Sequence, residues 1–326
     1  MYSHILVLLD GSPLAERALS MATLLAHRTG GSITLVRATP IPSVASSSSS
    51  WIERDRIAAN AYLTRIAGMP ELSGIAVKTH VLMGAPAAAV LDTAEAVGAD
   101  VIVISSHGRT GPATWLSGSV AEQVAHHAKM PVLVLRAGVL GARKMPSDAT
   151  RSLRVLVPLD GSTLAESALE PAAAWLAALA VPEPALHLVL ALAPTAEDTH
   201  NMPEVLALEG ARAYLSQVAD RMRAAHPQLA ISWTVTARFD VAEAVIRAAG
   251  TGDRDDGDLP AGACDAIAMA THGRTGITRW VLGSITERVL HATNLPLLIV
   301  RPTQRVSAQA AVLFNEGAAS QRLKEA

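Results

Sequence analysis

The sequence predicts an α/β protein with two tandem domains, each built on a five-stranded, parallel, doubly wound sheet. The first observation is a repeat: residues 4–19, HILVLLDGSPLAERAL, align with residues 154–169, RVLVPLDGSTLAESAL, and residues 107–119, HGRTGPATWLSGS, align with residues 272–284, HGRTGITRWVLGS. The second is the alternation of short β-branched runs with helical patterns inside each repeat. Such alternation is typical of parallel strands joined by right-handed crossovers.

Five strand-like runs occur in each repeat, and helical patterns separate most of them. The predicted strands of the first repeat are residues 5–9, 32–38, 77–82, 100–106 and 131–136. The predicted strands of the second repeat are residues 154–159, 185–192, 231–237, 265–271 and 296–301. Four helices are predicted in the first repeat. The first is capped by Ser12 and has Pro13 at its first position, the second and third cover residues 51–67 and 87–97, and the fourth begins at Ser119. We therefore expect an open, Rossmann-like sheet in each domain.

The repeats set the expected domain boundaries. They predict a first domain at residues 1–145, a second at residues 151–303, and a C-terminal tail at residues 304–326. The second repeat has about fifteen extra residues, most of which we assign to a solvated loop at residues 251–264, rich in charge, Gly and Pro. Half of the 326 residues are hydrophobic, so each domain can bury a core of its own.

The composition argues against several classes of partner. A formal net charge of −2 and a charged fraction of 17% give no global basic field to attract nucleic acid or anionic lipid. The most apolar stretch, from Ala172, is interrupted by Pro182 after about ten residues, too few to span a bilayer. Cys264 is the single cysteine, and the first residues lack a signal-peptide pattern. We expect a cytoplasmic protein that binds neither nucleic acid nor a membrane.

Polar, glycine-rich turns follow two strands of each repeat. Asp10 and Asp160 come directly after the first strand, and the HGRTG segments come directly after the fourth. In open α/β sheets, ligands bind beyond the carboxyl ends of the strands, where the strand order changes direction. We expect the two turns of each repeat to form a binding crevice there.

The HGRTG segments have the chemistry of a phosphate-binding loop. Glycines separated by nine residues let backbone N–H groups approach a ligand closely, and the helix that follows offers free N–H groups and a favourable dipole to an anion. An arginine adds a fork that matches phosphate oxygens. The residues concerned are Gly108, Arg109, Gly118 and Ser119 in the first repeat, and Gly273, Arg274, Gly283 and Ser284 in the second.

Each of these signals also has a purely structural interpretation. SVAE at residues 119–122 and SITE at residues 284–287 are capping boxes that would stabilise a helix without a ligand. Asp10 and Asp160 could be the acceptors of Asx-turns. The sequence analysis leaves both interpretations open, and the common position of the signals favours a site.

The histidines give no metal or catalytic site. His126 and His127 are adjacent on a helix, so they point about 100° apart and do not chelate one metal together. His107 and His272 precede the glycine loops and could contact phosphate, but neither has an evident carboxylate partner or nucleophile. We predict neither metal ligands nor catalytic residues.

The ordered combination of motifs resembles the universal stress protein family. The resemblance extends over residues 5–136 and 155–301. It rests on DGS after the first strand, on HGR after the fourth strand with nine residues between its glycine and the glycine of GS, and on the proline-led final strands MPVLVLR and LPLLIVR. The resemblance implies that the loops bind the phosphates and ribose of ATP, with Mg²⁺. It also implies that the acidic residue after the first strand contacts the nucleoside, and that backbone near Ala38 holds the adenine. Family members pair through their last strands, so residues 131–136 should lie beside residues 295–301 in an internal pseudo-dimer, and two such chains could associate further.

The chain departs from the family motif at two places. The family motif begins with a glycine that two residues separate from the loop glycine, and that position is Ser105 in the first repeat and Ala270 in the second. Gly84, after the third strand, is matched by Phe239 in the second repeat, where a bulky ring would narrow the site. We expect the second site to be the weaker one if the two differ.

Three functions are compatible with this sequence. The preferred one is an ATP-binding protein of stress response or signalling that acts through nucleotide-dependent conformation or partner binding. One alternative is a slow ATPase or phosphotransferase, although no residue is evident that would orient an attacking water. Another is a scaffold with degenerate nucleotide sites. AMP or a cyclic nucleotide would fit the same crevice as ATP.

Overall fold

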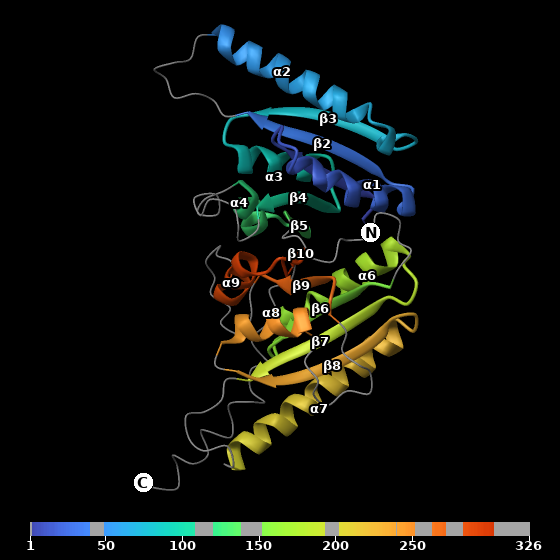
Figure 1. The fold of residues 1–326 in the computed structure, drawn as a ribbon, viewed down its shortest axis with the longest axis vertical. Helices are drawn as coiled ribbons and strands as arrows, with labels where there is room; N and C mark the ends of the chain where they lie inside the picture. Colours follow the sequence, from blue (N-terminus) through green and yellow to red (C-terminus); the bar gives the residue numbers. More distant parts are fainter. Residues whose placement is uncertain are drawn as a thin grey trace.

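One twisted, ten-stranded sheet runs through the computed structural model, which describes residues 2–39, 49–107, 120–137, 152–192, 202–238, 240–251, 263–271 and 283–302 (Figure 1). The strand order is β3-β2-β1-β4-β5-β10-β9-β6-β7-β8. Strands are parallel within each half, and the halves meet where β5 pairs with β10 in antiparallel orientation. The predicted pair of tandem doubly wound sheets, joined as a pseudo-dimer through their last strands, is therefore confirmed.

The first half contains the elements that the periodicity predicts. Its strands are β1 (His4–Leu9), β2 (Ser32–Thr39), β3 (Ala76–Met83), β4 (Val101–His107) and β5 (Val132–Ala137). Its helices are α1 (Ala18–Thr29), α2 (Ser49–Ala67), α3 (Pro86–Ala96) and α4 (Val120–His127), with 3₁₀ turns η1 (Ala15–Arg17) and η2 (Pro70–Leu72). Every strand end lies within one residue of its predicted position.

The start of the first helix differs from the prediction. Ser12 Oγ does accept a hydrogen bond from Ala15 N at 3.1 Å, as a capping serine should. The turn that follows is 3₁₀, however, and the α-helix begins only at Ala18. In the second half, Ser162 makes the same bond to Ala165 N, also at 3.1 Å, and an α-helical turn follows it directly.

The second half repeats this order. Its strands are β6 (Arg154–Leu159), β7 (Ala185–Leu192), β8 (Ala230–Ala237), β9 (Ala266–Ala270) and β10 (Leu297–Val300). Its helices are α5 (Thr163–Glu166), α6 (Leu169–Leu179), α7 (Met202–Ala225), α8 (Val241–Thr251) and α9 (Ser284–Ala292). α8 extends to Thr251, the first residue of the predicted solvated loop, and Cys264, its last residue, is buried. The residues between, 252–262, lie outside the described part of the chain.

Two apolar layers cover the two faces of the sheet. One layer combines side chains of α1, α2, α6 and α7 with one face of the strands, and the other combines side chains of α3, α4, α8 and α9 with the opposite face. Along β1, for example, Ile5 and Val7 belong to the first layer and Leu6 to the second. Each layer contains residues of both repeats, so the core is continuous across the junction. None of the helices in the described part of the chain has the length and hydropathy of a membrane span.

The junction between the halves has contacts on both sides of the β5–β10 pair. Arg136 Nε donates to the Thr293 carbonyl at 3.2 Å, and Arg301 Nη1 donates to the His127 carbonyl at 3.3 Å. Each arginine thus reaches the C-terminal end of a helix in the other repeat, where a cation is favourable. Burial lowers the pKa of Arg136 to about 10, which leaves it charged at neutral pH. On the other side of the sheet, Tyr2 Oη donates to the Pro171 carbonyl of α6 at 2.8 Å.

Gly31, between α1 and β2, allows a closer backbone approach than the other glycines in the described part of the first half. A Cβ at this position would lie 2.2 Å from the carbonyl oxygen of Ser3, whereas a Cβ on the neighbouring Gly30 would meet nothing within 4 Å. We expect Gly31→Ala to lower the free energy of unfolding by about 2–3 kcal/mol through steric overlap. The control Gly30→Ala should cost about 1 kcal/mol for its left-handed backbone. Urea denaturation measures both, and an equal or smaller loss for Gly31→Ala would contradict this account.

Candidate functional site

The Asp-Gly-Ser turn of each repeat lies at the point where the strand order changes direction. β1 pairs with β4 and β6 pairs with β9, and the chain continues away from each of these pairs on opposite sides. Asp10 follows β1 beside the end of β4, and Asp160 follows β6 beside the end of β9. The structure therefore brings the Asp-Gly-Ser turn of each half next to the end of the strand that precedes the HGRTG loop, at the usual position of ligand sites in this architecture. The loops themselves, residues 108–119 and 272–282, lie outside the described residues.

Both aspartates hold the turn that follows them. Asp10 Oδ1 accepts from Ser12 N at 2.8 Å, and Asp160 Oδ1 accepts from Ser162 N at 3.0 Å and from Ser162 Oγ at 2.6 Å. The intervening glycines adopt positive φ, +91° at Gly11 and +83° at Gly161. The predicted Asx-turns are thus present in both repeats. Asp10 nevertheless remains exposed, so its carboxylate stays accessible to a ligand.

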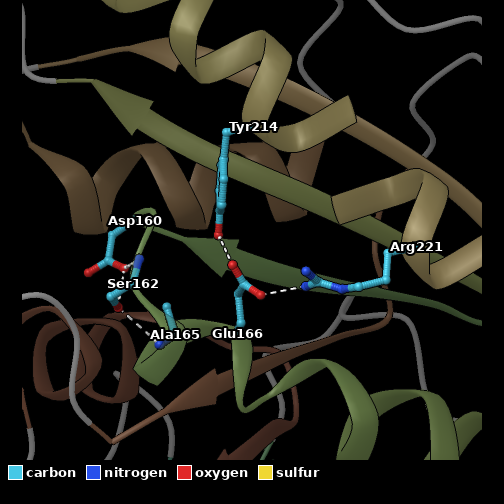
Figure 2. Close-up of polar contacts among 6 residues, drawn as sticks. All are labelled: Asp160, Ser162, Ala165, Glu166, Tyr214 and Arg221. Carbon is cyan, nitrogen blue, oxygen red and sulfur yellow. Dashed lines mark hydrogen bonds and ion pairs between the residues drawn. The ribbon is translucent and has the colours of Figure 1, made fainter. Parts of the chain in front are cut away.

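A glutamate, a tyrosine and an arginine form a polar cluster beside each of these turns. In the second half, the Glu166 carboxylate accepts from Tyr214 Oη at 2.8 Å and forms an ion pair with Arg221 (Figure 2). Glu166 belongs to α5, directly after the turn, and its two partners belong to α7. The cluster therefore fastens the second crossover helix to the turn. Burial, together with the negative charge of Glu166, raises the pKa of Tyr214.

The first half contains an equivalent cluster. Arg65 Nη2 lies 2.7 Å from Glu16 Oε1, and the Arg65 guanidinium lies 5.2 Å from the centre of the Tyr62 ring. The sequence analysis did not identify either cluster. The available signal was a glutamate at the same place in both repeats, LAER and LAES, and a tyrosine in each second helix.

Arg37 places a positive charge next to the turn of the first half, at a register position where the second half has a leucine. Its guanidinium covers Gly11, because a Cβ on that glycine would lie 3.3 Å from Arg37 Cζ, and the same Cζ lies 5.1 Å from the centre of the Tyr62 ring. Arg37 is in register with Leu9 of β1, and the corresponding partner of Leu159 in β6 is Leu190, which is buried. The two sites therefore differ in local charge, a difference that the sequence analysis did not recognise.

The ends of β4 and β9 differ in hydrogen bonding. Ser105 in β4 is half-buried, and its Oγ is inaccessible to solvent and has no hydrogen-bond partner among the described residues. Ala270 at the end of β9 is buried, and its carbonyl accepts from Thr286 Oγ1 of α9 at 3.0 Å. The first site therefore has a hydroxyl group where the second has only a methyl group.

The start of α9 corrects one of the structural interpretations. Gly283 is the N-cap residue, no side chain caps the helix, and Gly283 N donates to the Thr271 carbonyl at 2.6 Å. Ser284 is the first residue of the helix and is exposed, so the predicted capping box at residues 284–287 is wrong. The helix start is instead fixed by its backbone bond to the end of β9, which leaves the serine hydroxyl at the N-terminus of the helix.

Several predicted residues lie outside the described part of the chain. His107 ends β4, but its side chain is not described. The predicted helix start at Ser119 and the serine of the capping box at residues 119–122 also lie outside the described residues, and α4 is described from Val120 onward. The others outside the described residues are Gly108, Arg109, Gly118, Ser119, Phe239, His272, Gly273 and Arg274.

The turn after the third strand is built differently in the two halves. Ala38 is half-buried in β2, and next to it Gly84 N donates to the Thr39 carbonyl at 3.4 Å, with φ of +114° and open space around its Cα. In the second half, Asp240 Oδ1 caps α8 by accepting from Ala242 N at 3.0 Å and from Glu243 N at 3.1 Å. The Arg288 guanidinium of α9 pairs with Asp240 and lowers the pKa of that carboxyl. This ion pair ties the turn to α9 in the second half, whereas Ala85 at the equivalent N-cap of α3 has no such side chain.

Comparison with known proteins assigns the chain to a family. The model of the universal stress protein family matches residues 1–136 and 152–301. A universal stress protein of Mycolicibacterium smegmatis is 24% identical over 238 residues, which are 71% of each chain. One from Methanocaldococcus jannaschii is 40% identical over 74 residues, so this chain spans less than half of that relative, 44% of its length.

A solved structure has the same architecture over nearly the whole chain. The crystal structure of a universal stress protein from Archaeoglobus fulgidus matches with a TM-score of 0.62 and 18% identity, and covers 92% of this chain and 97% of that one. Each family-model match coincides with one half of the ten-stranded sheet and with one pair of polar turns. The chain belongs to the universal stress protein family, as a member with two tandem copies of the fold.

Proposed function

We propose that this protein binds an adenine nucleotide, ATP with Mg²⁺, at the carboxyl ends of the β1–β4 and β6–β9 pairs. We propose further that the bound nucleotide biases a conformation or a partner contact in stress response or signalling. The observation that carries the proposal is that the Asp-Gly-Ser turn lies at the switch point next to the strand that leads into the glycine loop, in both halves. Since Cys264 is the single cysteine and is buried, a reducing compartment such as the cytoplasm suits the chain.

The described residues fit the parts of a nucleotide. The first turn of α9, from Ser284, presents backbone N–H groups that suit a phosphate, whereas the Gly283 N–H is already bonded to the Thr271 carbonyl. The exposed carboxylate of Asp10 suits the hydroxyl groups of a ribose, and backbone at Ala38, beside the open space at Gly84, suits an adenine. Mg²⁺ is commonly held by phosphate oxygens together with one or two carboxylates, and Asp10 is available for such a role.

The first half is expected to bind more tightly than the second. Arg37 gives it a positive charge next to the turn, where the second half has Leu190. The buried Oγ of Ser105 has an unused hydrogen-bonding capacity that a ligand could satisfy, and Ala270 has no equivalent. We therefore propose a high-affinity site in the first half and a weaker one in the second, in agreement with the expectation from Phe239.

The substitution Asp10→Asn tests the proposal, because the amide oxygen can still accept the Ser12 N–H bond that holds the turn. The negative charge is lost, which weakens any charge-assisted hydrogen bond to the ligand. We expect about tenfold weaker binding of ATP with Mg²⁺ to the tighter site, measured by calorimetry. The matched variant Asp160→Asn should leave the affinity of that site unchanged.

Two further measurements separate the alternatives. The absence of any rise in melting temperature with ATP and Mg²⁺, together with no nucleotide released from freshly purified, denatured protein, would overturn the proposal. Mass spectrometry of the released nucleotide distinguishes ATP from AMP and from cyclic nucleotides. Hydrolysis of many ATP molecules per chain would support the ATPase alternative, and binding of nearly two ATP molecules per chain would exclude degenerate sites.

A further inference from the structure

Two equivalent helices flank the junction between the repeats on one face of the sheet. Figure 1 shows α4 and α9 near each other beside β5 and β10, and both helices contribute to the same apolar layer. Each carries a glutamate and a histidine four residues apart, Glu122 with His126 and Glu287 with His291. Residues with this spacing share one face of a helix. The repeat therefore places two Glu-x-x-x-His pairs at the junction.

The two pairs meet across the junction. The side-chain ligand atoms of Glu122, Glu287 and His291 all lie within 4.8 Å of one another. Within the helices, His126 Nε2 lies 3.8 Å from Glu122 Oε1, and His291 Nε2 lies 4.0 Å from Glu287 Oε1. The side chains of Glu122 and His126 are each 14% exposed, and those of Glu287 and His291 are 43% and 35% exposed. Two carboxylates from different repeats thus approach each other in a partly desolvated place, where their repulsion favours a bridging cation.

We propose that Glu122, Glu287 and His291 bind a divalent transition-metal ion of the Zn²⁺ class that joins the two repeats. Carboxylate oxygen and imidazole nitrogen are ligands that Zn²⁺ accepts, and two carboxylates balance its charge. His126, one turn from Glu122 and largely buried, can supply a fourth ligand by rotation of its side chain. The ion links α4 of one repeat to α9 of the other, apart from the Mg²⁺ that would accompany a nucleotide.

This site goes beyond the sequence prediction, which considered only the adjacent pair His126 and His127. His127 is exposed, and its Nδ1 is 2.8 Å from the Gln123 carbonyl of its own helix. His126 lies near Glu122, one turn away, which in turn lies near Glu287 and His291 of the other repeat. The sequence signal is the pair of segments EQVAH and ERVLH at equivalent positions.

Zn²⁺ titration of the full chain, tag-free, treated with EDTA and free of nucleotide, tests the proposal. We expect one Zn²⁺ per chain by calorimetry and a rise in melting temperature. Co²⁺ in the same site should give the visible absorption of a low-coordinate complex. Loss of an outer-shell group already weakens metal sites about 10- to 100-fold, so His291→Ala and the isosteric Glu287→Gln should each weaken Zn²⁺ binding by at least about tenfold.

Two control variants each remove a side chain that can bind a metal but is not among the proposed ligands. His127→Ala removes an exposed imidazole from the same helix, and Cys264→Ser removes the single thiol. Both should bind Zn²⁺ as the original chain does. Failure of the chain to bind Zn²⁺, or an equal loss of affinity in His127→Ala and Glu287→Gln, would overturn the proposal. Because no nucleotide is present, the result does not depend on whether ATP binds elsewhere.

Discussion

Replacing Trp175 with alanine is expected to lower the free energy of unfolding by about 4 kcal/mol, the largest effect of a single substitution considered for this fold. Trp175 in α6 is 1% exposed and belongs to the apolar layer that also contains side chains of α1. It lies one helical turn after Pro171, whose carbonyl accepts the Tyr2 hydrogen bond from the other repeat. Truncation therefore opens a large cavity next to the place where the two repeats contact each other.

Trp175→Phe separates lost volume from lost polarity. The Trp175 Nε1 atom is buried and has no hydrogen-bond partner among the described residues, so phenylalanine removes an unsatisfied donor while it keeps most of the apolar volume. We expect this variant to lose no more than about 1.5 kcal/mol. Urea denaturation followed by circular dichroism measures both variants. The explanation fails if phenylalanine and alanine destabilise the protein equally.

Acidification from pH 7.5 to pH 5 is expected to cost about 2 kcal/mol of stability through His187 alone. His187 lies in β7, is 2% exposed, and its Nδ1 is 2.9 Å from Ser232 Oγ of β8. Burial, assisted by the positive charge of Arg154, lowers its pKa from 6.5 to about 4. Between these two pKa values, the unfolded chain binds a proton at His187 and the folded chain does not. Stability from this group is therefore complete above pH 6.5 and is lost as the pH falls toward 4.

The equivalent position in the first repeat suggests a substitution that tests this effect. Thr34 occupies in β2 the position that His187 has in β7, since each is in register with an equivalent leucine of the first strand, Leu6 or Leu156. His187→Thr should remove about 2 kcal/mol from the difference in stability between pH 7.5 and pH 5. The control is His80→Thr on the exposed edge strand β3, which should leave this difference unchanged. Identical pH profiles for His187→Thr and the original chain would refute the role of this histidine.

The strands could be predicted because their signal is local. A parallel strand buried on both faces is a short apolar, β-branched run, and the ends of all ten strands lie within one residue of the prediction. The sequence also predicted the pairing of β5 with β10, through the resemblance to a family. The 3₁₀ turn after Ser12 could not be predicted, because a serine cap is compatible with both a 3₁₀ and an α-helical first turn.

Contacts between distant side chains could not be predicted from the sequence. The position of Arg37 above Gly11 depends on the register of two strands and on the rotamer of a long side chain. The approach of Glu122 to Glu287 depends on how closely two helices pack at the junction. The capping box at Ser284 failed for a related reason, since a backbone bond between Gly283 and the end of β9 fixes where α9 begins. Such features follow from tertiary packing rather than from local pattern.

The covalent connection between the halves of the sheet has an evolutionary consequence. In an assembly of two identical chains, every substitution appears twice, and both sites change together. Here the β5–β10 contact forms within one polypeptide, so the halves remain associated at any dilution and each can accept its own substitutions. Two equivalent positions show such divergence: Arg37 in the first half corresponds to Leu190 in the second, and Thr34 corresponds to His187. The single polypeptide is thus free of the symmetry that would force the two proposed nucleotide sites to share one affinity and the two halves to share one pH response.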